Sequence, residues 1–218
     1  MFDIISNLLF PSRHICLICK ENYGHRSFIC DDCYSSLELV HGEVYKDRPY
    51  IKKAYYSLFY NRYTRELIGN YKFRGKNYLY KVFGEIMMGT LEKYKLGEEI
   101  DMLAFVPSHR RKEALRGYNQ AELLAGYIAE KIKKPLSRGN LVKSRWTEEQ
   151  SHSNKADRAV NLRDSFYLKD PGKIRGKRIL LVDDLITTGA TMEECSRLLI
   201  ENGAREIIGL ALTSSKNN

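Results

Sequence analysis

The chain has 218 residues, of which 43% are hydrophobic and 29% charged, with a formal net charge of +9. These values are typical of a globular protein, and the length suits one α/β domain with a small additional module. No run of 18 apolar residues occurs, so we expect no membrane insertion. The N-terminal "MFDIISNLLF" lacks a basic start and a cleavage site. We interpret it as a short helix rather than a signal peptide, and expect a cytoplasmic protein.

Positive charge is unevenly distributed along the chain. Residues 1–50 contain five Lys or Arg against seven Asp or Glu, so the whole basic excess lies in the remainder. It gathers in three clusters, at residues 72–76, 109–117 and 173–178. Such clusters suit phosphate-rich partners, either nucleotides or nucleic acid, although each could equally form a solvated basic surface.

Four of the five cysteines form two C-x-x-C pairs near the N-terminus: Cys16, Cys19, Cys30 and Cys33. Two such pairs can close a tetrahedral site for a soft divalent ion, and structural zinc is our first expectation. Two disulfides are an alternative that an intracellular protein does not favour, and an iron–sulfur cluster is a lesser one. Cys195 falls in a helical pattern and is expected to be a buried apolar residue.

The segment around these cysteines is short and acidic, so metal binding would supply much of its folding free energy. Its charge argues against contact with nucleic acid and favours a structural module or a docking surface for a protein partner. We therefore assign residues 1–48 to a zinc-binding module and residues 49–218 to the body of the protein.

The body alternates between strand and helix patterns. We expect strands at 54–60, 101–107, 176–184 and 205–213, and helices at 64–72, 77–95, 117–134 and 190–204. This alternation predicts an α/β fold with a mainly parallel sheet flanked by helices. The polar segment 144–165 interrupts it and carries the one tryptophan, so it is either a lid over a site or a surface insertion.

The stretch "ILLVDDLITTGAT" at 179–191 takes two carboxylates to the end of a buried strand. Ligands of parallel α/β sheets bind beyond these strand ends. Gly189 permits close backbone approach, and the turn before the next helix suits a phosphate group. Asp183 and Asp184 could accept hydrogen bonds from vicinal hydroxyls, so phosphate beside a diol predicts a 5-phosphoribosyl ligand.

Other phosphate-binding classes fit this stretch less well. Phosphate-receiver domains also carry paired acids at strand ends, but without a glycine-containing hydroxyl turn directly after them. The G-x-x-x-x-G-K-[ST] motif of Walker-type nucleotidases is absent. A purely structural strand–turn–helix would explain one capping threonine but not the acid pair.

The same stretch resembles the signature of the type I phosphoribosyltransferases. Further motifs resemble the ComF family of competence proteins: "VPSHRRKEALRGYNQAELLA" at 106–125, T-x-x-Q at 147–150, R-x-x-N at 158–161 and the four-cysteine N-terminus. The resemblance covers nearly the whole chain, and it implies the type I phosphoribosyltransferase fold with a small zinc-binding module.

The resemblance also implies roles for particular residues. Asp183 and Asp184 would hold the ribose hydroxyls of phosphoribosyl pyrophosphate, and Arg110 would stabilise the departing pyrophosphate. The 5-phosphate would lie on Thr187, Thr188, Gly189, Ala190 and Thr191. Pyrophosphate would lie on Pro107, Ser108 and His109, and magnesium would arrive chelated by it. A flexible loop carrying Thr147, Gln150 and Arg158 would close over the site.

The functional expectation has two forms. The family resemblance implies a role in DNA uptake during natural transformation, with single-stranded DNA and other DNA-uptake proteins as partners. The alternative is an active phosphoribosyltransferase on an unidentified nucleobase or amine. The aromatic residues Tyr71, Phe73 and Tyr118 lie near basic residues and suit either base stacking or core packing.

Overall fold

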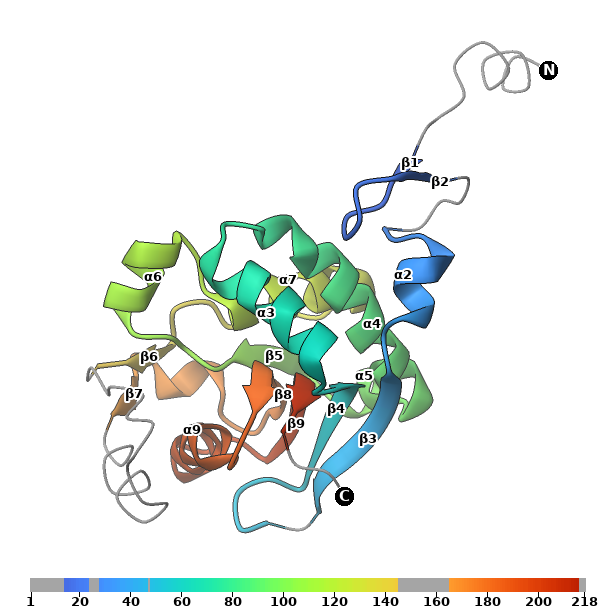
Figure 1. Cartoon of the computed structure of the whole chain (residues 1–218). Coiled ribbons are helices and arrows are strands. Elements are labelled where there is room, and N and C mark those ends of the chain that lie inside the picture. Colours follow the sequence, from blue (N-terminus) through green and yellow to red (C-terminus); the bar gives the residue numbers. More distant parts are fainter. Residues whose placement is uncertain (1–13, 24–27, 47, 145–164, 216–218) are drawn as a thin grey trace, which may run out of the picture.

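The computed structural model describes residues 14–23, 28–46, 48–144 and 165–215. Its main feature is a five-stranded sheet of order β3-β4-β9-β8-β5 (Figure 1). The strands are β3 (Leu39–Lys46), β4 (Lys53–Phe59), β5 (Met102–Phe105), β8 (Arg178–Ile186) and β9 (Glu206–Ser214). Neighbouring strands from β4 to β5 run parallel, and β3 adds an antiparallel edge. The predicted α/β class with a mainly parallel sheet is confirmed.

Helices cover both faces of this sheet (Figure 1). One face packs against α3 (Arg62–Phe73), α4 (Tyr80–Lys93) and α7 (Gln120–Ile132), and the other against α9 (Ala190–Glu201). Shorter elements are α5 (Leu96–Glu99), α6 (Arg110–Arg116), η1 (Asn77–Leu79) and η2 (Pro171–Lys173). None of the helices in the described ranges is long and apolar enough to span a membrane.

The sequence of β8 explains its central place. Leu180 and Val182 belong to the core under α4 and α7, whereas Ile179 and Leu181 belong to the core under α9. A strand covered on both faces needs a continuous apolar run rather than alternation, and β8 has one.

Several elements of the structure were not predicted from the sequence, each for a different reason. Strand β3 has an irregular register against β4, and His41 within it has a positive φ of 45°. Helix α6 has no buried residue, so it lacks the hydrophobic period that reveals a helix. Strands β6 (Leu141–Lys143) and β7 (Phe166–Leu168) are too short to stand out. The expected helix at 1–10 lies outside the described residues.

The cysteine-containing part consists of β1 (His14–Ile15), β2 (Asn22–Tyr23) and α2 (Asp31–Ser35). Strand β3 follows directly and belongs to the main sheet, although it falls within the range 1–48 assigned to the zinc-binding module. The boundary at residue 48 remains a prediction.

The contact between α4 and α7 yields a stability prediction. A Cβ added at Gly84 would lie 2.7 Å from Cγ of Tyr127, too close for any real contact. We expect Gly84→Ala to lower the free energy of unfolding by about 1–3 kcal/mol, because the Tyr127 ring must leave its packed position. Urea denaturation with equal m-values would measure this difference.

Gly69 is the matched control for this substitution. It lies within α3, and an added Cβ would meet nothing within 4 Å. Gly69→Ala should therefore stabilise the protein by about 0.5–1 kcal/mol through helix propensity alone. If the two substitutions change the free energy of unfolding equally, packing at the α4–α7 contact does not cause the effect of Gly84→Ala.

Candidate functional site

The candidate site lies where β5 ends, next to the longer strand β8. The last residue pair between them is Phe105 with Val182, whereas β8 continues beside β9 as far as Ile186. The carboxylates at 183 and 184 therefore lie on the strand just past the end of β5. The expected strand end at Asp184 was two residues short, because β9 continues to support the backbone there.

Asp183 and Asp184 point to opposite faces of the sheet, as adjacent residues of a strand must. Asp184 lies on the α3 face, where its Oδ2 is 2.8 Å from Nζ of Lys72. Asp183 Oδ1 accepts a hydrogen bond of 2.8 Å from the backbone N–H of Asp184. The two carboxyl groups thus have different partners and different surroundings.

These surroundings change the acidity of Asp183. Burial, followed by the charge of Asp184, raises the pKa of Asp183 to about 8. Lys72 and the backbone N–H of Asp184 act in the opposite direction. Asp183 therefore gains or loses a proton near pH 8, and a perturbed pKa of this kind is common at functional sites.

The turn after β8 has the geometry of an anion site. Gly189 adopts a left-handed conformation, with a φ of 81°, and caps the twelve-residue helix α9. Thr188 Oγ1 accepts from the N–H of Ala190 at 3.3 Å, while Thr187 is exposed. The first N–H groups of a helix lack intrahelical acceptors and carry partial positive charge, so this turn can bind a phosphate.

The loop after β5 lies beside this turn, because β5 and β8 are adjacent and parallel. It runs through Pro107 and Ser108 to His109, which caps α6 by accepting from Arg111 N–H at Nδ1 over 3.2 Å. Ser108 Oγ donates to Glu113 Oε1 at 2.9 Å, which fixes the loop. Arg110 is exposed as the first residue of α6.

Strands β6 and β7 form an antiparallel pair beside this loop. Lys143 forms a bridge with His109, and the backbone N–H of Ser144 donates to Ser165 O at 2.8 Å. Both ends of the segment between them therefore emerge beside the site. A cavity of about 460 Å³ lies between this strand pair and the loop, and its wall includes Pro107 and Arg110. Thr147, Gln150 and Arg158 lie outside the described residues.

Lys72 is the site residue that sequence reasoning missed. It was seen only as the start of the basic cluster 72–76. Nothing local links this cluster to the acid pair, because the ion pair exists only once α3 has packed on the sheet. In the sequence, the one indication of a role for Lys72 was its position at the end of an amphipathic helix.

The four N-terminal cysteines form a second site. Their Sγ atoms all lie within 4.8 Å of one another, and those of Cys19 and Cys30 are 3.8 Å apart. A tetrahedral ion with metal–sulfur bonds of 2.3 Å requires sulfur separations of about 3.8 Å, whereas a disulfide requires about 2 Å. The spacing fits a bound soft metal ion, and all five cysteines are free thiols.

Backbone groups favour a thiolate at Cys16, whereas burial and the neighbouring thiols raise the pKa of Cys33. Burial opposes charge on Cys16, but backbone N–H groups of Cys30, Cys19 and Ile18 lower its pKa to about 6. The bond from Ile18 N–H to Cys16 Sγ measures 3.4 Å. A thiolate is the form that binds a metal ion.

The cysteine cluster packs on the body through its buried members. Cys16, Ile29, Cys33 and Leu37 belong to the same core as α3, α4 and α7. Phe28 meets Tyr127 edge-to-face at 6.4 Å. A metal ion here would therefore stabilise one side of the main core as well as the local fold.

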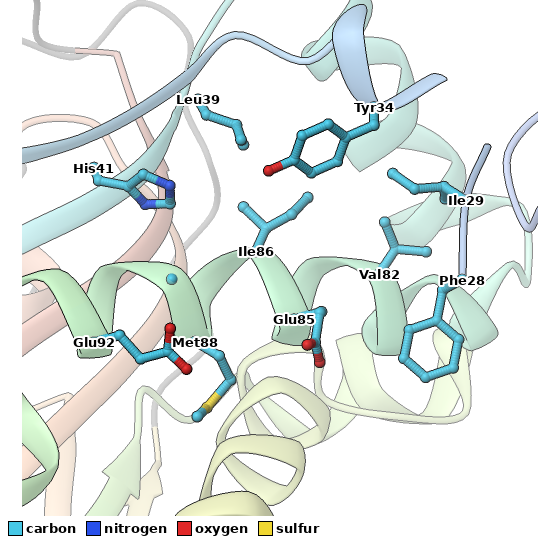
Figure 2. Close-up of a pocket in the computed structure, with 11 residues that line it drawn as sticks. Phe28, Ile29, Tyr34, Leu39, His41, Val82, Glu85, Ile86, Met88 and Glu92 are labelled. Carbon is cyan, nitrogen blue, oxygen red and sulfur yellow. The ribbon is translucent and has the colours of Figure 1, made fainter. Parts of the chain in front are cut away.

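A second cavity, of about 220 Å³, lies between the cysteine-containing part and α4 (Figure 2). Apolar side chains such as Ile86 and Leu39 form much of its wall, with Glu85 and Glu92 on α4 (Figure 2). Two carboxylates would repel a phosphate. This cavity therefore suits an anion less well than the N–H groups of the turn after β8 do.

The chain is similar to one known protein family and to several known proteins. Residues 119–218 match the family described as phosphoribosyl transferase domain, which includes β8, the turn and α9. The chain is 29% identical over 198 residues to competence protein ComFC of Bacillus subtilis (strain 168), covering 91% of this chain and 76% of that protein.

Two further relatives are similar over most of their lengths. Competence protein F of Haemophilus influenzae is 28% identical over 209 residues, covering 92% of this chain and 90% of its own. DNA utilization protein YhgH of Salmonella typhimurium is 25% identical over 201 residues, covering 88% and 87%. The similarity therefore extends over most of the chain.

Proposed function

We propose that this chain, a homologue of the ComF family of competence proteins, binds phosphoribosyl pyrophosphate with magnesium and acts in DNA uptake during natural transformation. The observation that supports the ligand is an acid pair near the end of β8, followed by a glycine-capped helix and lying just past the end of the parallel strand β5. The names of the relatives support the biological role. The proposed location is the cytoplasm, whose reducing conditions keep the cysteines as thiols.

Each part of the ligand has a matching feature. The 5-phosphate would bind the N–H groups of the turn at 187–191, whose left-handed Gly189 allows close approach. Asp183 and Asp184 would accept hydrogen bonds from the ribose hydroxyls. Pyrophosphate would lie along 107–110 with its magnesium ion, and Arg110 would stabilise its charge on departure. The segment that carries Thr147, Gln150 and Arg158 would exclude water.

Transfer of the phosphoribosyl group to a nucleobase or amine is the alternative function. It requires the same binding site and, in addition, an acceptor. Release of pyrophosphate with a panel of nucleobases and amines would identify an enzyme, whereas binding without release would favour a ligand-sensing role. No described side chain stands out as a base for the acceptor.

The metal of the cysteine cluster is proposed to be zinc. Four thiolates at tetrahedral spacing are typical of a closed structural zinc site, which leaves no position open for catalysis. The cluster would then serve as a structural element and as a docking surface for other DNA-uptake proteins.

Single-stranded DNA is proposed to bind beside α6. Of the three aromatic residues considered from the sequence, Tyr71 is fully buried and Tyr118 donates its hydroxyl hydrogen bond to Tyr71 O. Phe73 is 69% exposed, and the Arg116 guanidinium lies 4.6 Å from its ring centre. An exposed aromatic beside a basic helix suits base stacking with phosphate contacts.

The ligand proposal predicts the effect of neutralising the acid pair. Asp183→Asn and Asp184→Asn keep the side-chain shape but lose charge-assisted hydrogen bonds. Measured above pH 8, where Asp183 of the parent is ionised, each should weaken binding by about 1.5–3 kcal/mol. Isothermal titration calorimetry with phosphoribosyl pyrophosphate and magnesium would measure the loss.

Asp101→Asn is the matched control for these variants. Asp101 is at the opposite end of the β5–β8 pair, where it accepts from Arg178 at 2.9 Å. This variant should bind the ligand as the parent does. Undiminished binding by both site variants would contradict the assignment of the acid pair.

The zinc proposal predicts about one zinc ion per chain by elemental analysis of the purified protein. Cys16→Ser should reduce the metal content and expose the adjoining core, lowering the thermal midpoint. Cys195→Ala is the control, since this buried cysteine lies outside the cluster and the metal content should stay unchanged. A fully folded, metal-free protein with four titratable thiols would overturn the proposal.

The DNA surface predicts that Phe73→Ala weakens binding of a labelled oligothymidylate by about 1–3 kcal/mol without changing the salt dependence. Replacing Arg111 and Lys112 on α6 by Glu should instead reduce the slope of affinity against salt, whereas Lys173, Arg175 and Lys177, before the opposite end of β8, should contribute less. Fluorescence anisotropy at several salt concentrations measures both. Tyr34→Ala, an exposed aromatic change in the cysteine-containing part, should have no effect. A Phe73→Ala variant with parental affinity would exclude this surface.

A further inference from the structure

Lys72 reaches the acid pair from a helix that lies outside the strand–turn–helix unit. Its Nζ is 2.8 Å from Asp184 Oδ2, and the two side chains are only 18% and 12% exposed. Among the described residues, Lys72 is the cation at ion-pair distance from either carboxylate of the pair. A buried lysine held by a single carboxylate is a specific arrangement rather than a solvated surface contact.

The end of α3 is fixed by its neighbours. Tyr71 Oη donates to Gln120 O at 2.8 Å, and Tyr118 donates in turn to Tyr71 O. Tyr71 also meets Phe83 edge-to-face with ring centres 5.4 Å apart. These contacts hold the backbone of Lys72 in one place, so its ammonium reaches Asp184 from a fixed direction.

The two carboxyl groups still have acceptor capacity. Lys72 engages Oδ2 of Asp184, and the Asp184 N–H engages Oδ1 of Asp183. Within the described ranges, no hydrogen bond to a further residue is formed by the other oxygen of either group. One acceptor on each carboxyl group thus matches the two hydroxyls of a ribose.

The charged and titratable groups around the pair come from several elements. Lys72 and Tyr71 on α3 and Cys195 on α9 interact with the pair itself. A second group of residues interacts with these three side chains: Arg116 on α6 with Lys72, Tyr118 and Tyr80 with Tyr71, and Lys143 on β6 and Glu194 on α9 with Cys195. Burial opposes the charge of Lys72, but the attraction of Asp184 outweighs burial and raises the pKa of Lys72. Lys72 therefore stays charged across the neutral range.

We propose that Lys72 is the positioning residue of this site: its ammonium holds Oδ2 of Asp184 from a fixed direction, so that the other oxygen of Asp184 faces the ligand beside Asp183. The inference rests on the proposed function for its ligand. Asp184 would offer a fixed acceptor to one hydroxyl, and Asp183 would strengthen its bond to the other as it ionises.

The expected pH dependence follows from this division of roles. The pKa of Asp183 is raised, so its carboxyl group is neutral below about pH 8 and ionised above it. Ligand affinity in the parent should therefore rise through this range. Without Lys72 the two acids repel with no compensating cation, and they should share one proton that is lost only at higher pH.

Carboxyl ¹³C NMR on the ligand-free full chain tests the inference directly. In the parent, the Asp183 resonance should titrate near pH 8. In Lys72→Met the Asp183 and Asp184 resonances should titrate together, with the midpoint raised by roughly one pH unit or more. Lys72→Arg should restore the parental pattern, and Lys72→Gln provides a second variant if Met impairs folding.

Calorimetry with phosphoribosyl pyrophosphate and magnesium provides the second measurement. At pH 8, Lys72→Met should lose roughly tenfold in affinity and regain part of it at higher pH, whereas Lys81→Met, an exposed change on α4, should behave as the parent. If Lys72→Met binds the ligand as the parent does, and its carboxyl groups titrate as in the parent, the proposed role of Lys72 is wrong. Absence of binding by the parent, with the expected titrations, would instead overturn the proposed ligand.

Discussion

Two adjacent carboxylates within a sheet impose the main constraint on this fold. Burial of an unpaired carboxylate is costly, and two neighbouring ones also repel each other. Lys72 compensates Asp184, and a backbone N–H compensates Asp183. Helix α3 must therefore end where its lysine reaches β8, and the hydrogen bonds of Tyr71 to the start of α7 hold it there.

The same constraint explains why β5 is short. If β5 continued beside β8, its backbone would cover the edge of the strand next to the acid pair. Its pairing ends at Phe105, and the chain turns away through Pro107 into α6. The open edge leaves room for a ligand, and the loop and the β6–β7 pair surround it.

The cysteine cluster depends on the body for its stability as much as on a metal ion. Its own strands are two residues long and its helix five, too little to form an independent core. Cys16 and Cys33 instead belong to the core beneath α3 and α4. Metal binding and packing against the body thus stabilise the same residues.

The sequence by itself determined the features that depend on local order. The C-x-x-C pairs, the apolar run of β8, and the glycine turn into α9 were all readable, because each depends on residues only a few positions apart. Only the tertiary structure decided that Lys72 pairs with Asp184, that Tyr71 is buried while Phe73 is exposed, and that β3 joins the main sheet. These contacts join segments far apart in the chain, and the physical reason is that burial and ion pairing depend on distance in space, which no local pattern encodes.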